Sequence, residues 1–72
     1  MAYVNNIVVR TLMLEKRISQ QSLLNIMEQE GLFSNAGRTS NYVTLNMALT
    51  GKRTSARYVD ILQKAYSVLV RL

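Results

Sequence analysis

Apolar residues recur at helical spacing in four segments of this chain, and that spacing limits what the chain can fold into. The segments are 4–16, 19–31, 41–50 and 55–72. Intervals of three and four residues place apolar side chains on one side of an α-helix, whereas a strand needs alternation. The chain has no proline, and no Asn-Gly or Asp-Gly pair marks a hairpin turn. We therefore predict an all-α fold of four or five helices.

Capping residues predict where these helices begin and end. Ser19, Asn41 and Ser55 each precede an apolar run, and their side chains can accept a hydrogen bond from the first turn of a helix. Gly31 and Gly51 follow such runs and can take the left-handed conformation that ends a helix. We expect the third helix to span Asn41 to Thr50.

The first segment leaves a strand open as an alternative, because its first half is rich in β-branched residues (Val4, Ile7, Val8 and Val9). We prefer a helix, since Lys16 and Arg17 suit the negative end of the helix dipole.

The second segment ends in two acids, Glu28 and Glu30, where the dipole disfavours negative charge. We interpret this end as exposed and uninvolved in binding. Residues 32–40, LFSNAGRTS, are rich in turn-forming side chains and are predicted to form a loop, with Leu32 and Phe33 folding back onto the core.

The last segment carries more apolar residues than one face of a small domain requires. Its helical stripe runs through Tyr58, Leu62, Ala65, Leu69 and Leu72. A small chain often gains core by dimerising, so we predict a homodimer seam over residues 66–72. The alternative is a helix edge that covers the chain's own core.

The residue types that usually carry catalysis are scarce. The 72 residues make one domain, 1–72, with no Cys and no His. The four acids are not spaced like the paired carboxylates of hydrolases. We expect no enzyme activity, no metal site and no cofactor.

The net charge of +5 and a pI near 10.1 favour a polyanionic partner: DNA, RNA or an anionic membrane surface. No long apolar run predicts a membrane span or a signal peptide, so we expect a cytoplasmic protein. RNA ranks low, because the few aromatic residues form no base-stacking motif.

The stretch from Arg38 to Arg57, RTSNYVTLNMALTGKRTSAR, concentrates this positive charge. Four basic residues and no acid lie between Gly31 and Val59. A short helix followed by cations is often presented to a nucleic-acid backbone. An ordinary amphipathic helix with a solvated basic tail fits the same residues.

Two motifs resemble the Cro/repressor helix-turn-helix family, which has the lambda-repressor-like DNA-binding fold. Residues 18–23, ISQQSL, are similar to the l-s-q-e-e-L start of that family's second helix. Leu45 followed by ALTGKR at 48–53 looks like the i…xxnGkr end of its recognition helix. Val9 and Leu12 fall where its first helix is apolar. The resemblance implies a small helix-turn-helix domain of four or five helices.

Three departures from the family pattern accompany this resemblance. Leu24 stands where the family usually has Ala, and the turn between helices two and three is longer by roughly ten residues. Met13 and Leu49 stand where many members pair an Arg with a Glu. Replacing both partners of a buried ion pair with apolar groups can be neutral or stabilising, so we expect Met13 and Leu49 to touch in the core.

The resemblance also implies a set of DNA contacts. The residues implied to face the bases in the major groove are Tyr42, Val43, Asn46 and Met47. Val43 and Met47 could equally belong to the core. The residues implied to face phosphates are Gln20, Arg38, Asn41, Lys52, Arg53 and Arg57. For each cation among them, the alternative is a side chain that is simply exposed to solvent.

We therefore expect a sequence-specific regulator of transcription of phage or bacterial type, binding double-stranded DNA as a homodimer in the bacterial cytoplasm. The alternative is a protein-interaction module, in which the same helical fold binds another regulator or inhibits a host protein.

Overall fold

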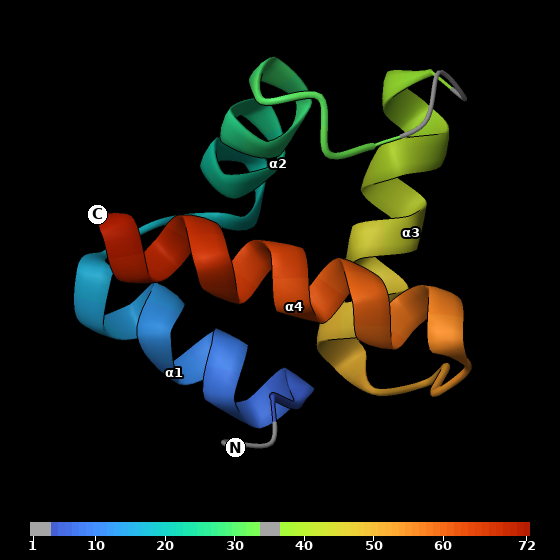
Figure 1. The fold of residues 1–72 in the computed structure, drawn as a ribbon, viewed down its shortest axis with the longest axis horizontal. Coiled ribbons are helices and arrows are strands. Elements are labelled where there is room, and N and C mark those ends of the chain that lie inside the picture. Colours follow the sequence, from blue (N-terminus) through green and yellow to red (C-terminus); the bar gives the residue numbers. More distant parts are fainter. Residues whose placement is uncertain (1–3, 34–36) are drawn as a thin grey trace.

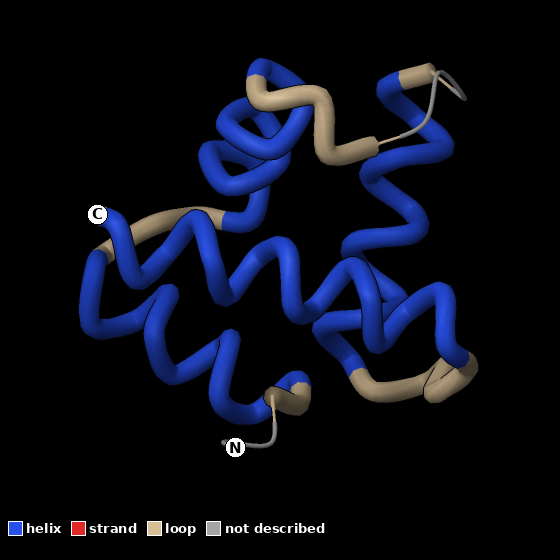
Figure 2. Tube along the Cα trace, in the orientation of Figure 1, coloured by secondary structure: helices blue, strands red, loops and turns tan. Residues whose placement is uncertain are grey.

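Four α-helices make up the computed structural model, which describes residues 4–33 and 37–72. The helices are α1 (Asn6–Lys16), α2 (Gln20–Gln29), α3 (Arg38–Thr50) and α4 (Ala56–Arg71). The described residues contain no strand, and Figure 2 shows only helices joined by loops. The prediction of an all-α fold is confirmed, including a helix for the β-branched first segment.

The longest helix, α4, lies at the centre of the fold. Figure 1 shows it crossing the molecule with α1 along one side, α2 on the other, and α3 passing behind it so that the end of α3 lies on the α1 side. It contacts all three of the other helices. The buried core accordingly draws on every helix: Val9, Leu23, Leu24, Met27, Leu45, Ala48, Leu49, Ile61, Leu62, Ala65, Val68 and Leu69.

Most of the predicted helix ends are confirmed. The Ser19 hydroxyl accepts a hydrogen bond from the Ser22 N–H at 3.1 Å. Ser55 occupies the N-cap position of α4 as predicted, but its side chain makes no capping hydrogen bond. Gly51 ends α3 with a left-handed φ of 76°. A Cβ at this position would lie 3.0 Å from the Asn6 Nδ2 atom, so glycine also permits the close approach of α1.

The predicted start of α3 is wrong. The helix begins at Arg38 rather than Asn41, and its N-cap is Gly37, which has no side chain to cap it. Asn41 already donates its backbone N–H to the Gly37 carbonyl at 3.0 Å, and its side chain is bonded to Glu28 on α2. The Asn41 side chain is therefore engaged with α2 rather than with a helix start.

The predicted loop at 32–40 is correspondingly shorter, because residues 38–40 are helical, while residues 34–36 lie outside the described residues. Leu32 and Phe33 pack against the core as predicted. The Leu32 N–H donates to the Met27 carbonyl at 2.9 Å, and the Lys64 Nζ atom lies 3.4 Å from the Leu32 carbonyl oxygen. This segment therefore ties the end of α2 to α4.

The C-terminal segment mostly covers the chain's own core. Val68 and Leu69 are buried and Tyr66 is half-buried, whereas Val70 and Leu72 are exposed. This burial agrees with the alternative prediction, in which the segment is a helix edge that covers the chain's own core. Two apolar side chains of the segment remain at the surface. Of the described helices, none has the length and apolar character needed to cross a membrane.

Met13 and Leu49 come from different helices and line one hollow of about 330 Å³ between α1, the start of α2 and the end of α3. Leu49 is buried, and Met13 is half-buried against the core. Leu24 is buried as well.

Candidate functional site

One side of α3 is exposed and, apart from Arg38 in the first turn, which is paired with Glu28, carries no charge. Its side chains are Thr39, Tyr42, Val43, Asn46 and Thr50, and we call this surface the α3 face. The spacing of three and four residues places them on one side of the helix, while the opposite side contributes Leu45, Ala48 and Leu49 to the core. The α3 face thus offers hydroxyl groups, one amide and apolar surface.

Three of the four predicted base-contacting residues lie on the α3 face. Tyr42 is 44% exposed and Val43 is 45% exposed, so Val43 does not belong to the core. Asn46 is exposed one turn further on. Met47 is half-buried, and its sulfur lies 4.0 Å from the Tyr58 hydroxyl oxygen, which favours the alternative of a core position for this residue.

Three exposed cations, Lys52, Arg53 and Arg57, follow the α3 face in the chain, and we call them the loop cations. Within the described parts of the chain, none of them forms an ion pair. The Arg57 Nη2 atom lies 3.4 Å from the Thr44 hydroxyl, and its guanidinium lies 5.8 Å from the centre of the Tyr58 ring. These contacts hold the first turn of α4 beside α3.

The other three predicted phosphate contacts are less open to a ligand, because they are paired or at least half-buried. Arg38 pairs with Glu28 at 2.8 Å, and Asn41 is only 7% exposed. Gln20 is half-buried at the start of α2, and its Nε2 atom is buried without a hydrogen-bond partner. The structure therefore leaves the loop cations as the predicted set that is open to a ligand.

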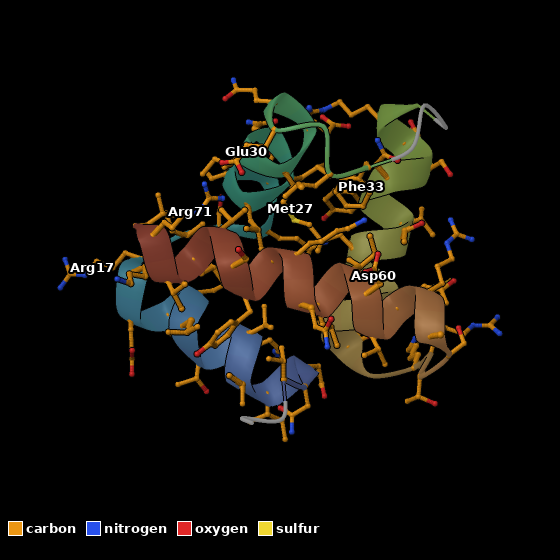
Figure 3. The ribbon with its side chains drawn as sticks, in the orientation of Figure 1. Arg17, Met27, Glu30, Phe33, Asp60 and Arg71 are labelled. Atoms are coloured by element: carbon orange, nitrogen blue, oxygen red, sulfur yellow. The ribbon has the colours of Figure 1, made fainter. Side chains whose placement is uncertain are left out.

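A second group of free cations was missed by the sequence analysis. Arg10, Lys16 and Arg17 are exposed on α1 and at its end, and they form no ion pair among the described residues; we call them the α1 cations. Figure 3 shows Arg17 extending away from the corner between α1 and α2. Sequence reasoning assigned Lys16 and Arg17 to the helix dipole and did not consider Arg10.

Three of the four acids account for this distribution of positive charge, while Glu15 is exposed on α1 beside Lys16 and forms no ion pair among the described residues. Glu28 pairs with Arg38, Asp60 pairs with Lys64 at 2.9 Å, and Glu30 pairs with Arg71 at 2.5 Å. Figure 3 labels Glu30 and Arg71, which come from α2 and α4. Three of the nine basic residues are thereby neutralised, and the six that remain are the loop cations and the α1 cations.

The predicted exposure of the end of α2 holds for Glu30, whereas Glu28 is half-buried against α3; that this end takes no part in binding stays a prediction. Glu28 accepts hydrogen bonds from the Arg38 Nη1 atom at 2.8 Å and from the Asn41 Nδ2 atom at 3.0 Å. Arg38 also donates to the Asn25 side-chain oxygen. The partners lie on α3, beyond the long connection, which is why the local sequence made Glu28 look misplaced.

Within residues 4–33 and 37–72, no three acidic side chains gather into a group that could hold a metal ion. No protein-family model, curated protein or solved structure matches the chain. The surface chemistry of the chain and its family-like motifs therefore carry the functional argument.

Proposed function

We propose that this protein binds double-stranded DNA through the α3 face, as a transcriptional regulator of phage or bacterial type. The observation that carries the proposal is the position of an exposed, uncharged helix face directly before three free cations. The resemblance of residues 18–23 and 48–53 to the Cro/repressor family supports the same assignment. Base edges are read by neutral hydrogen-bonding and apolar groups as well as by cations, whereas phosphates mainly require cations.

The α3 face supplies side chains suited to reading bases. The major groove of B-DNA is about 12 Å wide and admits an α-helix. Asn46 can donate to and accept from an adenine edge, and Val43 can contact a thymine methyl group. Tyr42 has both a ring for apolar contact and a hydroxyl for a base or a phosphate.

The loop cations supply the phosphate contacts in this proposal. Each cation that neutralises a phosphate releases a counterion, so affinity falls as the salt concentration rises. The α1 cations extend the basic surface beyond the stretch identified from sequence. Arg38, Asn41 and Met47 are left out of the proposed contact set, because Glu28 neutralises Arg38, Asn41 is buried and Met47 is half-buried.

A homodimer is part of this proposal. A module of this size gains affinity when two copies bind half-sites about one helical turn apart. The exposed Val70 and Leu72 side chains near the end of α4 are apolar surface that a second copy could cover. The cytoplasm of a bacterial host is the compartment in which such a regulator would act.

The test is a binding series on mixed genomic duplex fragments at several salt concentrations, with the bound fragments sequenced. We expect enrichment of one sequence and a steep fall of affinity with salt. Arg53→Ala should weaken binding to all duplexes about equally and reduce the salt slope by about one. Asn46→Ala should cost about 1–3 kcal/mol on the enriched duplex and little on random duplex.

A protein partner is the second candidate, and the exposed Tyr42 and Val43 side chains favour it. Both are apolar or aromatic at the middle of the α3 face, and tyrosine is enriched at the centres of protein interfaces. Another regulator protein would then cover this face. If the wild-type chain shows no salt-dependent duplex binding, this candidate replaces the DNA-binding proposal.

A further inference from the structure

The connection between α2 and α3 is longer than the turn of a helix-turn-helix motif, but by fewer residues than the roughly ten predicted from the sequence. Eight residues, Glu30 to Gly37, separate the end of α2 from the start of α3. In a helix-turn-helix motif a turn of three or four residues holds the two helices at a fixed angle. A connection of eight residues constrains the angle less than such a turn does. Contacts of α3 with the other helices therefore contribute to its direction, and those with α2 are among them.

Polar side chains make those contacts at the N-terminal end of α3. Both carboxylate oxygens of Glu28 are used: Oε1 accepts from Arg38 at 2.8 Å and Oε2 accepts from Asn41 at 3.0 Å. Asn25 accepts from the other terminal nitrogen of Arg38. We call these four residues the Glu28 clamp. It joins the last two turns of α2 to the first turn of α3.

The Glu28 clamp is partly shielded from solvent. The Glu28 side chain is 23% exposed, and Asn41 is buried. An ion pair at the open surface contributes little, because water and salt screen it, whereas hydrogen bonds to a half-buried carboxylate are stronger. The clamp lies at the end of α3 where Gly37 has no side chain to cap the first turn.

We infer that Glu28 is a positioning residue for the α3 face. Asn41 directly precedes Tyr42 in the chain, and Arg38 lies one helical turn before it, so both clamp residues of α3 fix the backbone from which Tyr42 projects. Glu28 acts on the ligand only through α3. This inference rests on the proposed DNA binding, and it assigns to an acidic residue a role in a surface that is otherwise neutral or basic.

The experiment compares Glu28→Gln with Glu30→Gln as a matched control. Both variants remove one negative charge from the end of α2, but Glu30 pairs with Arg71 of α4 and, among the described residues, forms no ion pair with α3. Glutamine keeps the size of the side chain but removes its charge, so Arg38 loses its ion-pair partner, and Asn41 keeps a hydrogen bond only if its amide turns over. Affinity is measured on the duplex enriched by the wild type and on random duplex, and folding is checked by circular dichroism.

We expect Glu28→Gln to lower the ratio of the two affinities about tenfold, which is the size of one lost base contact. Glu30→Gln should leave the ratio within about twofold of the wild type, because it removes the same charge from the same helix end. A charge exchange, Glu28→Arg with Arg38→Glu, should return the ratio toward the wild-type value, since the amides of Asn25 and Asn41 can each donate or accept. A folded Glu28→Gln variant with an unchanged ratio would overturn the inference.

Two further measurements decide the remaining outcomes. If Glu28→Gln does not fold, Asn25→Ala removes only the exposed partner of Arg38: a lower ratio supports the inference and an unchanged ratio overturns it. If the wild type selects no duplex, the DNA-binding proposal fails by itself. Hydrogen exchange at the Asn41 and Tyr42 amides then tests the clamp: faster exchange in Glu28→Gln than in Glu30→Gln supports it, and equal rates overturn it.

Discussion

The two ends of α3 are held in place by different kinds of interaction. At the N-terminal end, Gly37 provides no side-chain cap, and the Glu28 clamp makes charged and polar contacts with α2. At the C-terminal end, Leu45, Ala48 and Leu49 are buried, and the Asn6 side chain donates to the Leu49 carbonyl at 3.2 Å. Salt and charge should affect the first end, whereas packing volume should affect the second.

The largest expected effect is at the C-terminal end of α3. Leu49→Arg places an unpaired charge at a position that is 4% exposed, and it should lower the free energy of unfolding by about 3–5 kcal/mol. Leu49→Met keeps the volume and should cost less than about 1.5 kcal/mol. Urea unfolding followed by circular dichroism measures both. Equal stability of the two variants would show that this end is not fixed by packing.

A charge at Met13 should be tolerated better than one at Leu49. Met13 is half-buried and lines the hollow between α1 and α3, so an arginine there can extend its charged group toward solvent. Met13→Arg should therefore destabilise by about 1–3 kcal/mol, less than Leu49→Arg in the same unfolding experiment. A larger cost at Met13 would show that its side chain lies deeper than the structure places it.

The next effect concerns the glycine that ends α3. Gly51→Ala should cost about 1–2 kcal/mol, because its φ of 76° disfavours a Cβ and the new atom would lie 3.0 Å from Asn6. Gly31→Ala is the control: its φ of 71° is similar, but nothing lies within 4 Å of the added atom. Thermal unfolding should rank Gly51→Ala below Gly31→Ala. The opposite order would argue against close approach of α1 to this turn.

At the N-terminal end of α3 the expected loss of stability is smaller and depends on salt. Glu28→Gln should cost about 1 kcal/mol, the usual contribution of a hydrogen bond to a folded protein. The difference from the wild type should shrink as ionic strength rises, because part of it is ionic. Leu49→Met should show no such dependence. Urea unfolding at low and high salt measures both variants. An equal change of stability with salt in Glu28→Gln and Leu49→Met would contradict the proposed difference between the two ends of α3.

The smallest effect should have the opposite sign. Arg17 ends α1 with a left-handed φ of 56°, the conformation that α3 reaches with Gly51. Arg17→Gly removes the cost of a side chain in this conformation and should raise stability by up to about 1 kcal/mol. If the α1 cations contact DNA, the same variant should reduce the salt slope of binding by about one. A loss of stability would show that Arg17 makes contacts beyond its backbone.

The parts of the fold that the sequence predicted depend on short-range signals. Helical spacing of apolar residues placed four helices, Ser19 marked the start of α2, and Gly51 marked the end of α3. Each of these signals acts within one or two turns of the chain. Such interactions are visible in a single segment because the partner groups are close in sequence.

The errors came from side chains whose partners are distant. Asn41 looked like a cap because its bond to Glu28 spans thirteen residues, and Glu30 looked unpaired because Arg71 lies 41 residues away. The α1 cations were missed as well, because the sequence shows a concentration of positive charge only between Arg38 and Arg57. Which cations remain unpaired depends on the same long-range ion pairs. Three of the four predicted base-contacting residues nevertheless lie on the exposed α3 face, because helical spacing alone determines which side faces outward.

The central position of α4 has a consequence for how the protein is made. A ribosome releases α1, α2 and α3 before α4, although α4 is the helix that contacts all three. Isolated helices of 10 to 13 residues are marginal in water, so the first three helices leave the ribosome without the partner that stabilises them. Folding of this domain must therefore wait until the residues of α4 have emerged, and synthesis that stops before Ala56 would leave a chain that cannot form its core.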